Sequence, residues 1–281
     1  MAAVEAEGEI AAARGAGRSG VLTIVPMFAA FSLEEVARQA EGPQWFQLYH
    51  VSADLTESLV ARAESAGYAA IVLTVDGSAP TIRERDRRNG FDPWATGLLE
   101  ANLVDAPASL RSLSPREILA LPRQATWSDV ARLRAATSLP VVLKGITTAE
   151  DARVAVEHGV DGIVVSTHGG RLIDSTLSSI ESLPEVVEAV GDRVEVFLDS
   201  GIRRGSDALK ALALGARAVG IGRPLYWGLT VGGADGVHAV LEILRAELDL
   251  ALAYSGGTDI REVNRAVLNI PPGFGATSPA P

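Results

Sequence analysis

Residues 140–166 have the sequence PVVLKGITTAEDARVAVEHGVDGIVVS, in which two short apolar runs flank a helical pattern. Thr148 stands before Glu150 and Asp151, and a hydroxyl followed by acids is typical of a helix N-terminus. The apolar runs show little alternation, which is typical of strands buried on both faces of a parallel sheet. The stretch therefore predicts one βαβ unit of an α/β fold.

The same alternation of strand and helix patterns extends over the rest of the chain. Strands are expected at residues 21–25, 45–49, 69–76, 140–145, 162–166, 194–199 and 218–222. Helices are expected at residues 32–40, 56–66, 126–136, 149–158, 179–190, 206–214 and 235–253, and a further helical pattern covers 5–16. We predict a (β/α)8 TIM barrel, formed as a single domain over residues 1–281, with seven of its eight strands recognisable.

A parallel barrel that lacks a strand keeps two unpaired edges. Because the helical pattern at 5–16 has no strand before it, we expect the first βα unit to be incomplete at the N-terminus.

Two segments depart from the alternation. Residues 79–125 are rich in Arg, Pro and Leu without clear periodicity, and we predict an active-site loop or lid there. Residues 270–281 are rich in Pro and Gly, and we predict a loose tail.

Composition excludes several classes of function. The chain has no cysteine, so disulfides, thiolate metal ligands and a cysteine nucleophile are excluded. Its net charge of -10 argues against nucleic-acid binding. No apolar run reaches the length of a membrane span, and the first twenty residues lack the apolar core of a secretory signal. We expect a cytoplasmic protein that has no metal site and no membrane span and does not bind nucleic acid.

Polar side chains stand at the ends of six expected strands, where barrel enzymes place their chemistry. They are Gln47 and Tyr49, Thr74 and Asp76, Lys144, Ser166 and His168, Asp199, and Gly222 with Arg223. His168 is followed by two glycines and Arg171. Imidazole is a natural proton acceptor near neutral pH, and guanidinium is a natural carboxylate clamp. The segment therefore predicts a base beside an anion site.

A second motif consists of LDSGIRRG at 198–205 and IGRP at 221–224. The loops after the last two strands of a barrel often bind phosphate through backbone N–H groups and a helix N-terminus. Gly201, Gly205 and Gly222 would permit close approach, while Arg203 and Arg223 supply charge. These residues predict a ligand that carries phosphate, without selecting one.

Seven motifs stand in one order between residues 12 and 268. They are WFQLY at 45–49, LTVD at 73–76, RERDRRNGF at 83–91, LKG at 143–145, STHGGR at 166–171, LDSGIRRG at 198–205 and IGRP at 221–224. In these motifs the chain closely resembles the FMN-dependent α-hydroxy-acid dehydrogenases, among them glycolate oxidase, lactate oxidase and mandelate dehydrogenase.

The resemblance implies FMN as cofactor and a role for each matching residue. His168 is then the base, Asp76 stabilises its imidazolium, Tyr49 contacts the substrate hydroxyl, and Arg83 with Arg171 binds the substrate carboxylate. Lys144 is also implied in catalysis, at the edge of the flavin ring. The implied FMN contacts are Gln47, Thr74, Lys144, Ser166, Asp199, Ser200, Gly201, Arg203, Gly222 and Arg223. The implied reaction oxidises a small 2-hydroxy acid to the 2-oxo acid, with oxygen, a quinone or another acceptor regenerating the flavin.

The chain departs from the family pattern in three places. Thr167 stands where the family has asparagine, and Ser200 stands where it has glycine. The family's N-terminal segment, with a substrate-binding tyrosine, and its first barrel strand have no counterpart, and Pro26 and Met27 stand where the family has a serine pair near the flavin.

Three hypotheses remain open on the sequence. The first is an active FMN enzyme, and the second is a truncated or decayed remnant that binds FMN or another phosphate ligand weakly. The third is a different phosphate-binding barrel enzyme, such as an aldolase or isomerase. The HGGR motif at 168–171 disfavours the third, because it supplies a base and an anion clamp but no Schiff-base arrangement. Whether the chain forms a homo-oligomer, as family members often do, also stays open.

Overall fold

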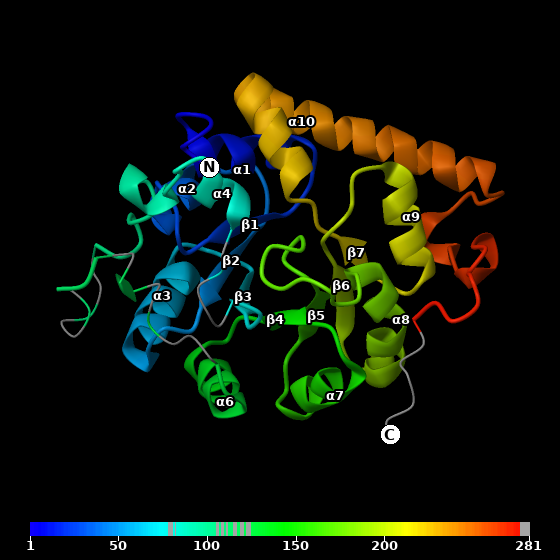
Figure 1. The fold of residues 1–281 in the computed structure, drawn as a ribbon, viewed down its shortest axis with the longest axis horizontal. Coiled ribbons are helices and arrows are strands. Elements are labelled where there is room, and N and C mark those ends of the chain that lie inside the picture. Colours follow the sequence, from blue (N-terminus) through cyan, green and yellow to red (C-terminus); the bar gives the residue numbers. More distant parts are fainter. Residues whose placement is uncertain are drawn as a thin grey trace.

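A single curled sheet of seven parallel strands forms the centre of the molecule (Figure 1). The structure is a computed structural model, and it describes residues 1–77, 81, 83–104, 107, 110, 112–114, 117–118, 121 and 125–275. The strands are β1 (Thr23–Pro26), β2 (Gln44–Tyr49), β3 (Ala70–Thr74), β4 (Val141–Ile146), β5 (Gly162–Val165), β6 (Glu195–Leu198) and β7 (Ala218–Val219). Their spatial order is their chain order, and β1 and β7 are the edges of the sheet. The prediction of an incomplete TIM-like barrel with seven strands is confirmed.

Helices lie on the outside of the sheet (Figure 1): the first precedes β1, the last follows β7, and the others lie in the connections between successive strands. They are α1 (Gly8–Arg18), α2 (Leu33–Gln39), α3 (Ala53–Ser65), α4 (Glu84–Arg88), α6 (Trp127–Ala136), α7 (Ala149–Glu157), α8 (Ser179–Val190), α9 (Gly205–Ala213) and α10 (Arg223–Tyr254). Short 3-10 turns are η1 (Pro93–Thr96), η2 (Gly191–Arg193), η3 (Ile260–Glu262) and η4 (Arg265–Val267). No helix in the described ranges combines the length and apolarity that crossing a bilayer requires.

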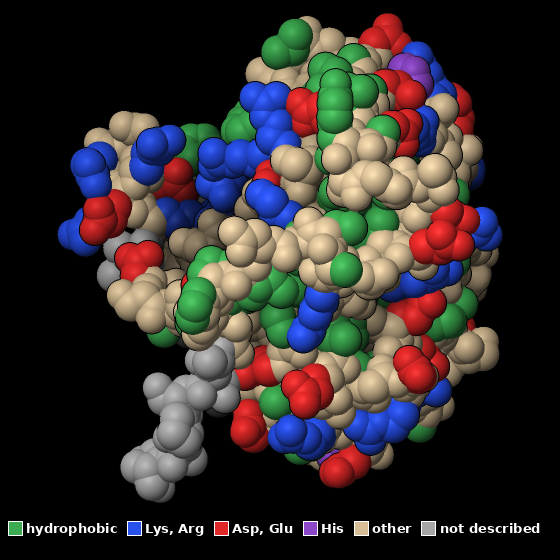
Figure 2. All heavy atoms as spheres, turned by 90° about the vertical axis from the view of Figure 1, so that its right-hand side faces the viewer, with side chains coloured by type: hydrophobic (Ala, Val, Ile, Leu, Met, Phe, Trp, Pro, Cys, Tyr) green, Lys and Arg blue, Asp and Glu red, His purple; other side chains and the backbone are tan. Residues whose placement is uncertain are grey.

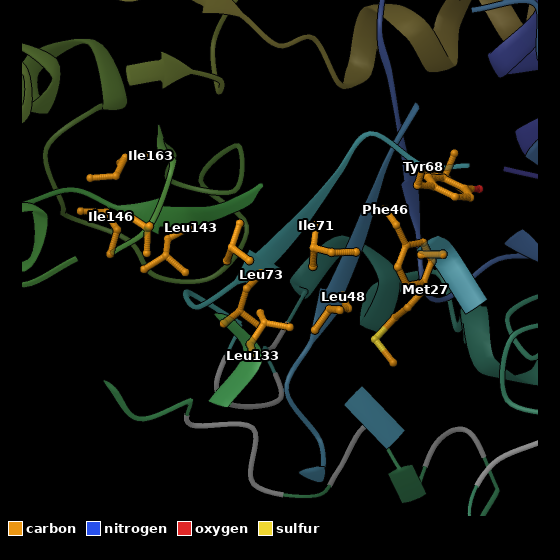
Figure 3. Close-up of a cluster of buried hydrophobic side chains, with 14 of the residues drawn as sticks. Met27, Phe46, Leu48, Tyr68, Ile71, Leu73, Leu133, Leu143, Ile146 and Ile163 are labelled. Atoms are coloured by element: carbon orange, nitrogen blue, oxygen red, sulfur yellow. The ribbon is translucent and has the colours of Figure 1, made fainter. Parts of the chain in front are cut away.

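Both faces of the sheet are packed. Every residue of β3 and β5 is buried, as expected of strands covered on both sides. Successive side chains of a strand point to opposite faces, so Ile71 and Leu73 join the main core under the helices (Figure 3), whereas Val72 joins a smaller cluster with Val142 and Val164. The packed sheet fixes where each strand ends, and thereby positions the residues that follow.

Two helices begin earlier than the sequence indicates. Helix α3 begins at Ala53, because the Ser52 hydroxyl accepts a hydrogen bond from Leu55 N (3.3 Å) and so caps the helix. Helix α10 begins at Arg223, with Pro224 in its first turn, where proline suits a helix. Its backbone is non-helical at Gly232 and Gly233, so the expected helix at 235–253 corresponds to the part after this kink.

The segment at 79–125 contains more structure than its composition suggests. Helix α4 and the turn η1 lie within it, while several of its other residues fall outside the described part of the chain. Its role as a lid stays a prediction. Of the expected tail, residues 270–275 are described and contain neither helix nor strand, and residues 276–281 lie outside the description.

Helix α1 packs against α10 beside the open edges of the sheet, and Gly15 lies at the contact. A Cβ atom at Gly15 would lie 2.4 Å from Ala234 O and 2.7 Å from Val237 Cβ. We therefore expect Gly15→Ala to lower the free energy of unfolding by about 1–3 kcal/mol, measured by urea denaturation. The control is Gly232→Ala, where no heavy atom lies within 4 Å of the new Cβ and φ is -152°. Equal stability of the two variants would contradict this packing.

Candidate active site

The carboxyl ends of the strands bring the predicted polar residues to one edge of the sheet. Tyr49 on β2 pairs in register with Thr74 on β3, and Thr74 pairs with Lys144 on β4. Asp199 directly follows β6. In Figure 2, Lys and Arg side chains gather beside a hollow between an outlying lobe and the body of the molecule. The arrangement therefore confines the candidate chemistry to one end of the barrel.

His168 and Asp76 form a hydrogen-bonded pair. The distance from His168 Nδ1 to Asp76 Oδ1 is 3.1 Å, and the side chains are 20% and 13% exposed. With Nδ1–H donating to the carboxylate, a neutral imidazole keeps its lone pair on Nε2. Nε2 can then accept a proton, and the carboxylate stabilises the resulting imidazolium. Asp76 Oδ2 is buried and has no hydrogen-bond partner among the described residues.

Gly145 explains why Asp76 can reach this position. Gly145 has φ +109°, and a Cβ atom there would lie 2.6 Å from Asp76 Cβ. The glycine of the LKG motif is therefore required by the approach of the Asp76 segment, as well as by its own backbone conformation.

Lys144 connects the two sides of the site. Its Nζ donates to Ser166 Oγ (2.7 Å) and lies 3.1 Å from Asp199 Oδ2. Lys144 is 14% exposed and Asp199 22%, so this ion pair is partly shielded from water. On the neighbouring strands, Gln47 Nε2 donates to Thr74 Oγ1 (2.8 Å). The charge of Lys144 is thus held in place by two partners rather than left on a mobile side chain.

Two arginines supply positive charge near Tyr49. Burial lowers the pKa of Arg83, and the positive charge of Arg171 lowers it further, whereas Asp86 and Tyr49 act in the opposite direction. Arg83 Nε is buried without a hydrogen-bond partner among the described residues. A guanidinium group that is partly desolvated and repelled by a second one would be stabilised by a bound anion. The pair is therefore suited to a carboxylate.

The predicted phosphate loops meet at the start of α10. Gly201 and Gly222 have open space where a Cβ atom would point. Arg223 Nη2 donates to Gly169 O (3.4 Å), and the guanidinium of Arg203 lies over the ring of Trp227 at 6.0 Å. The helix N-terminus and these two arginines offer donors and charge to an anion.

One predicted role at these loops is wrong. A Cβ atom at Gly205 would lie 2.0 Å from Leu248 N, so this glycine serves the contact between α9 and α10 rather than ligand approach.

The sequence gives no signal for two residues that support the site. Ser179 is buried, and its single hydroxyl hydrogen is shared between the backbone oxygens of Asp199 (Oγ–O 2.6 Å) and Ser200 (3.0 Å). The neighbouring Ser178 caps α8 with Glu181, so the pair of serines resembles an ordinary helix start. Trp227 is distinguished only by its contact with Arg203.

Comparisons with known proteins agree with this geometry. The family model described as FMN-dependent dehydrogenase matches residues 1–270. An L-lactate oxidase of Nostoc sp. is 44% identical over 276 residues, which are 94% of this chain and 75% of that protein. Glycolate oxidase of Spinacia oleracea is 43% identical over 267 residues, which are 92% of this chain and 72% of that protein.

Solved structures show the same likeness in three dimensions. A crystal structure of mandelate oxidase superimposes with a TM-score of 0.84 at 43% identity, covering 94% of this chain and 74% of the other. The chain thus spans about three quarters of these relatives. It belongs to the FMN-dependent dehydrogenase family, among the relatives of the 2-hydroxy-acid oxidases.

Proposed function

We propose that this chain binds FMN and oxidises a small 2-hydroxy acid to the corresponding 2-oxo acid. The observation that carries the proposal is the His168–Asp76 pair, which places a proton acceptor at the same end of the barrel as two arginines suited to a carboxylate. An aldolase or isomerase would not require this combination.

The chain's own residues account for binding and proton transfer. Arg83 and Arg171 hold the carboxylate of the substrate, and Tyr49 contacts its hydroxyl group. His168 Nε2 accepts the hydroxyl proton, and Asp76 stabilises the imidazolium that forms. Together these groups orient the substrate, so that its hydroxyl oxygen gives a proton to His168, while the hydrogen on the adjacent carbon leaves with its bonding electron pair and the C=O double bond forms.

The residues fit FMN. Open space at Gly201 and Gly222, the N-terminus of α10, Arg203 and Arg223 would receive its phosphate. The remaining contacts would come from Gln47, Thr74, Lys144, Ser166, Asp199 and Ser200. Bound FMN supplies a two-electron acceptor, which oxygen, a quinone or another acceptor then reoxidises. The charge of Lys144, fixed by Ser166 and Asp199, would stabilise a reduced anionic ring.

The open edges of β1 and β7 are the observation that favours the alternative of a remnant without catalysis. Loss of a strand can loosen a site enough to prevent the reaction while binding persists.

One experiment distinguishes an active 2-hydroxy-acid oxidase from a remnant without catalysis. The chain is purified with FMN, and its visible absorbance near about 450 nm is followed without oxygen as lactate, glycolate or mandelate is added. We expect a bound flavin that bleaches with at least one of these acids, while a 3-hydroxy acid serves as the control. A colourless protein, or bound flavin that none of the acids bleaches, would establish the remnant instead.

A further inference from the structure

Ser200 stands between the end of β6 and the segment that carries His168. It follows Asp199, and its φ is +73°, in the left-handed region that side chains other than glycine rarely adopt. Among the described residues, the other two non-glycine residues with positive φ are His168 (+53°) and Ser175 (+64°). An unfavourable backbone at Ser200 persists only if surrounding contacts maintain it.

The Ser200 hydroxyl makes three hydrogen bonds whose directions are determined. Thr167 N (3.2 Å) and Gly169 N (2.9 Å) are backbone donors, so Ser200 Oγ must accept from both. The single hydroxyl hydrogen then donates to Asp199 Oδ1, at 2.8 Å. One donor and two acceptor positions are the full capacity of a hydroxyl group. The Ser200 side chain is therefore fully committed between the His168 segment and the Asp199 carboxylate.

The amide of His168 itself is held by a second serine. His168 N donates to Ser166 Oγ (3.1 Å), which also accepts from Lys144 Nζ (2.7 Å). Lys144 in turn pairs with Asp199 Oδ2 (3.1 Å). A closed chain of contacts thus runs from Ser200 through Asp199, Lys144 and Ser166 to His168, and two hydroxyls satisfy three consecutive amides.

These contacts hold a turn with an unusual backbone conformation. Residues 168–170 all have positive φ, and successive amides in this conformation form a concave group of donors. Here the concavity is filled by side chains of the protein. The imidazole of His168 leaves this anchored turn and meets Asp76 at 3.1 Å.

We infer that Ser200 is a positioning residue for the base. Its hydroxyl holds the 167–169 segment in the conformation that directs His168 Nδ1 to Asp76, and it joins that segment to the Asp199–Lys144 pair on the cofactor side. The orientation of the imidazole is a property of this chain alone, whereas the effect on rate rests on the proposed function.

The first test measures the tautomer of the His168 imidazole directly and needs no FMN. In the ¹⁵N-labelled chain, the ring nitrogen shifts of His168, assigned with His168→Gln, report which nitrogen carries the proton. We expect Ser200→Ala and Ser200→Gly to shift His168 from the Nδ1–H form toward an average of the two tautomers. Ser200→Gly also removes the backbone strain, so it keeps the fold even if Ser200→Ala is unstable.

The matched control is Ser175→Gly. Ser175 is exposed and also has a left-handed backbone, so replacing it by glycine removes the same kind of backbone strain at a position outside the Ser200 network. Unchanged His168 shifts in Ser200→Gly, or the same change in Ser175→Gly, would overturn the inference.

The second test uses the chain loaded with FMN. Ser200→Gly should slow flavin reduction by a 2-hydroxy acid about 10- to 100-fold, because a small misplacement of a catalytic group greatly lowers the rate. The dissociation constant for the 2-oxo acid should stay that of the unaltered chain. Equal rates in the two proteins would refute the positioning role. A chain that takes up no FMN would instead refute the proposed function, and the nitrogen shifts would still decide the role of Ser200.

Discussion

Replacement of His168 by asparagine should slow reduction of the bound flavin by a 2-hydroxy acid about 10²- to 10⁴-fold, the usual contribution of a general base. The asparagine amide can still donate a hydrogen bond to Asp76, so the partly buried carboxylate keeps a partner. It cannot accept the hydroxyl proton near neutral pH. FMN should stay bound, because the residues proposed to hold it are unchanged.

The measurement is anaerobic stopped-flow absorbance, with His158→Gln as the control. His158 directly follows α7, where its ring stacks on Trp127 at a centroid distance of 5.1 Å and its Nδ1 lies 2.9 Å from Val154 O. Its replacement should leave the rate of reduction intact. A His168→Asn variant that reduces flavin at the original rate would remove His168 from the role of base.

The strands and their ends were predictable because their signal is local. The runs in β3 and β5 are continuous and apolar, and β4 begins with such a run at 141–143, as a parallel sheet buried on both faces requires. Once the strands are placed, the rule that parallel strands end at one edge brings Tyr49, Asp76 and Lys144 together without further information. The seven-stranded sheet was predictable for the same reason, because the sequence contains seven strand-like runs.

The features that were missed depend on contacts between distant segments. Gly205 has the same local pattern as the phosphate-loop glycines, and only its approach to Leu248 reveals a packing role. The start of α10 at Arg223 was hidden, because Gly232 and Gly233 interrupt the helical periodicity. The positioning role of the Ser200 hydroxyl was hidden as well, because the amides of Thr167 and Gly169, from which it accepts, lie more than thirty residues away.

Local charge at the site opposes the charge of the whole molecule. The chain carries a net charge of -10, which repels an anionic substrate at long range, although salt screens this effect beyond about 10 Å. Affinity for a carboxylate must therefore come from short-range, desolvated contacts. Arg83 can supply part of such a contact: its side chain is 38% exposed, but its Nε is buried and its pKa is lowered by burial and by Arg171.

Replacement of Arg83 by methionine should therefore weaken binding of the 2-oxo acid about 10- to 100-fold, as expected for loss of hydrogen bonds to a charged group. Methionine is chosen because it fills similar space without a charge. The dissociation constant follows from the change in flavin absorbance or from titration calorimetry. The 2-oxo amide, which lacks the negative charge, should bind weakly to the original chain and to the variant alike.

Arg88→Met provides the control for loss of a positive charge from the same region. Arg88 lies on α4, the short helix that begins directly after Arg83, but it is 76% exposed and pairs with Glu84 on the surface, so water already screens its charge. Its removal should leave binding of the 2-oxo acid within the error of the measurement. If Arg83→Met weakened the acid and the amide equally, its effect would come from lost packing, and the carboxylate would have to be bound elsewhere.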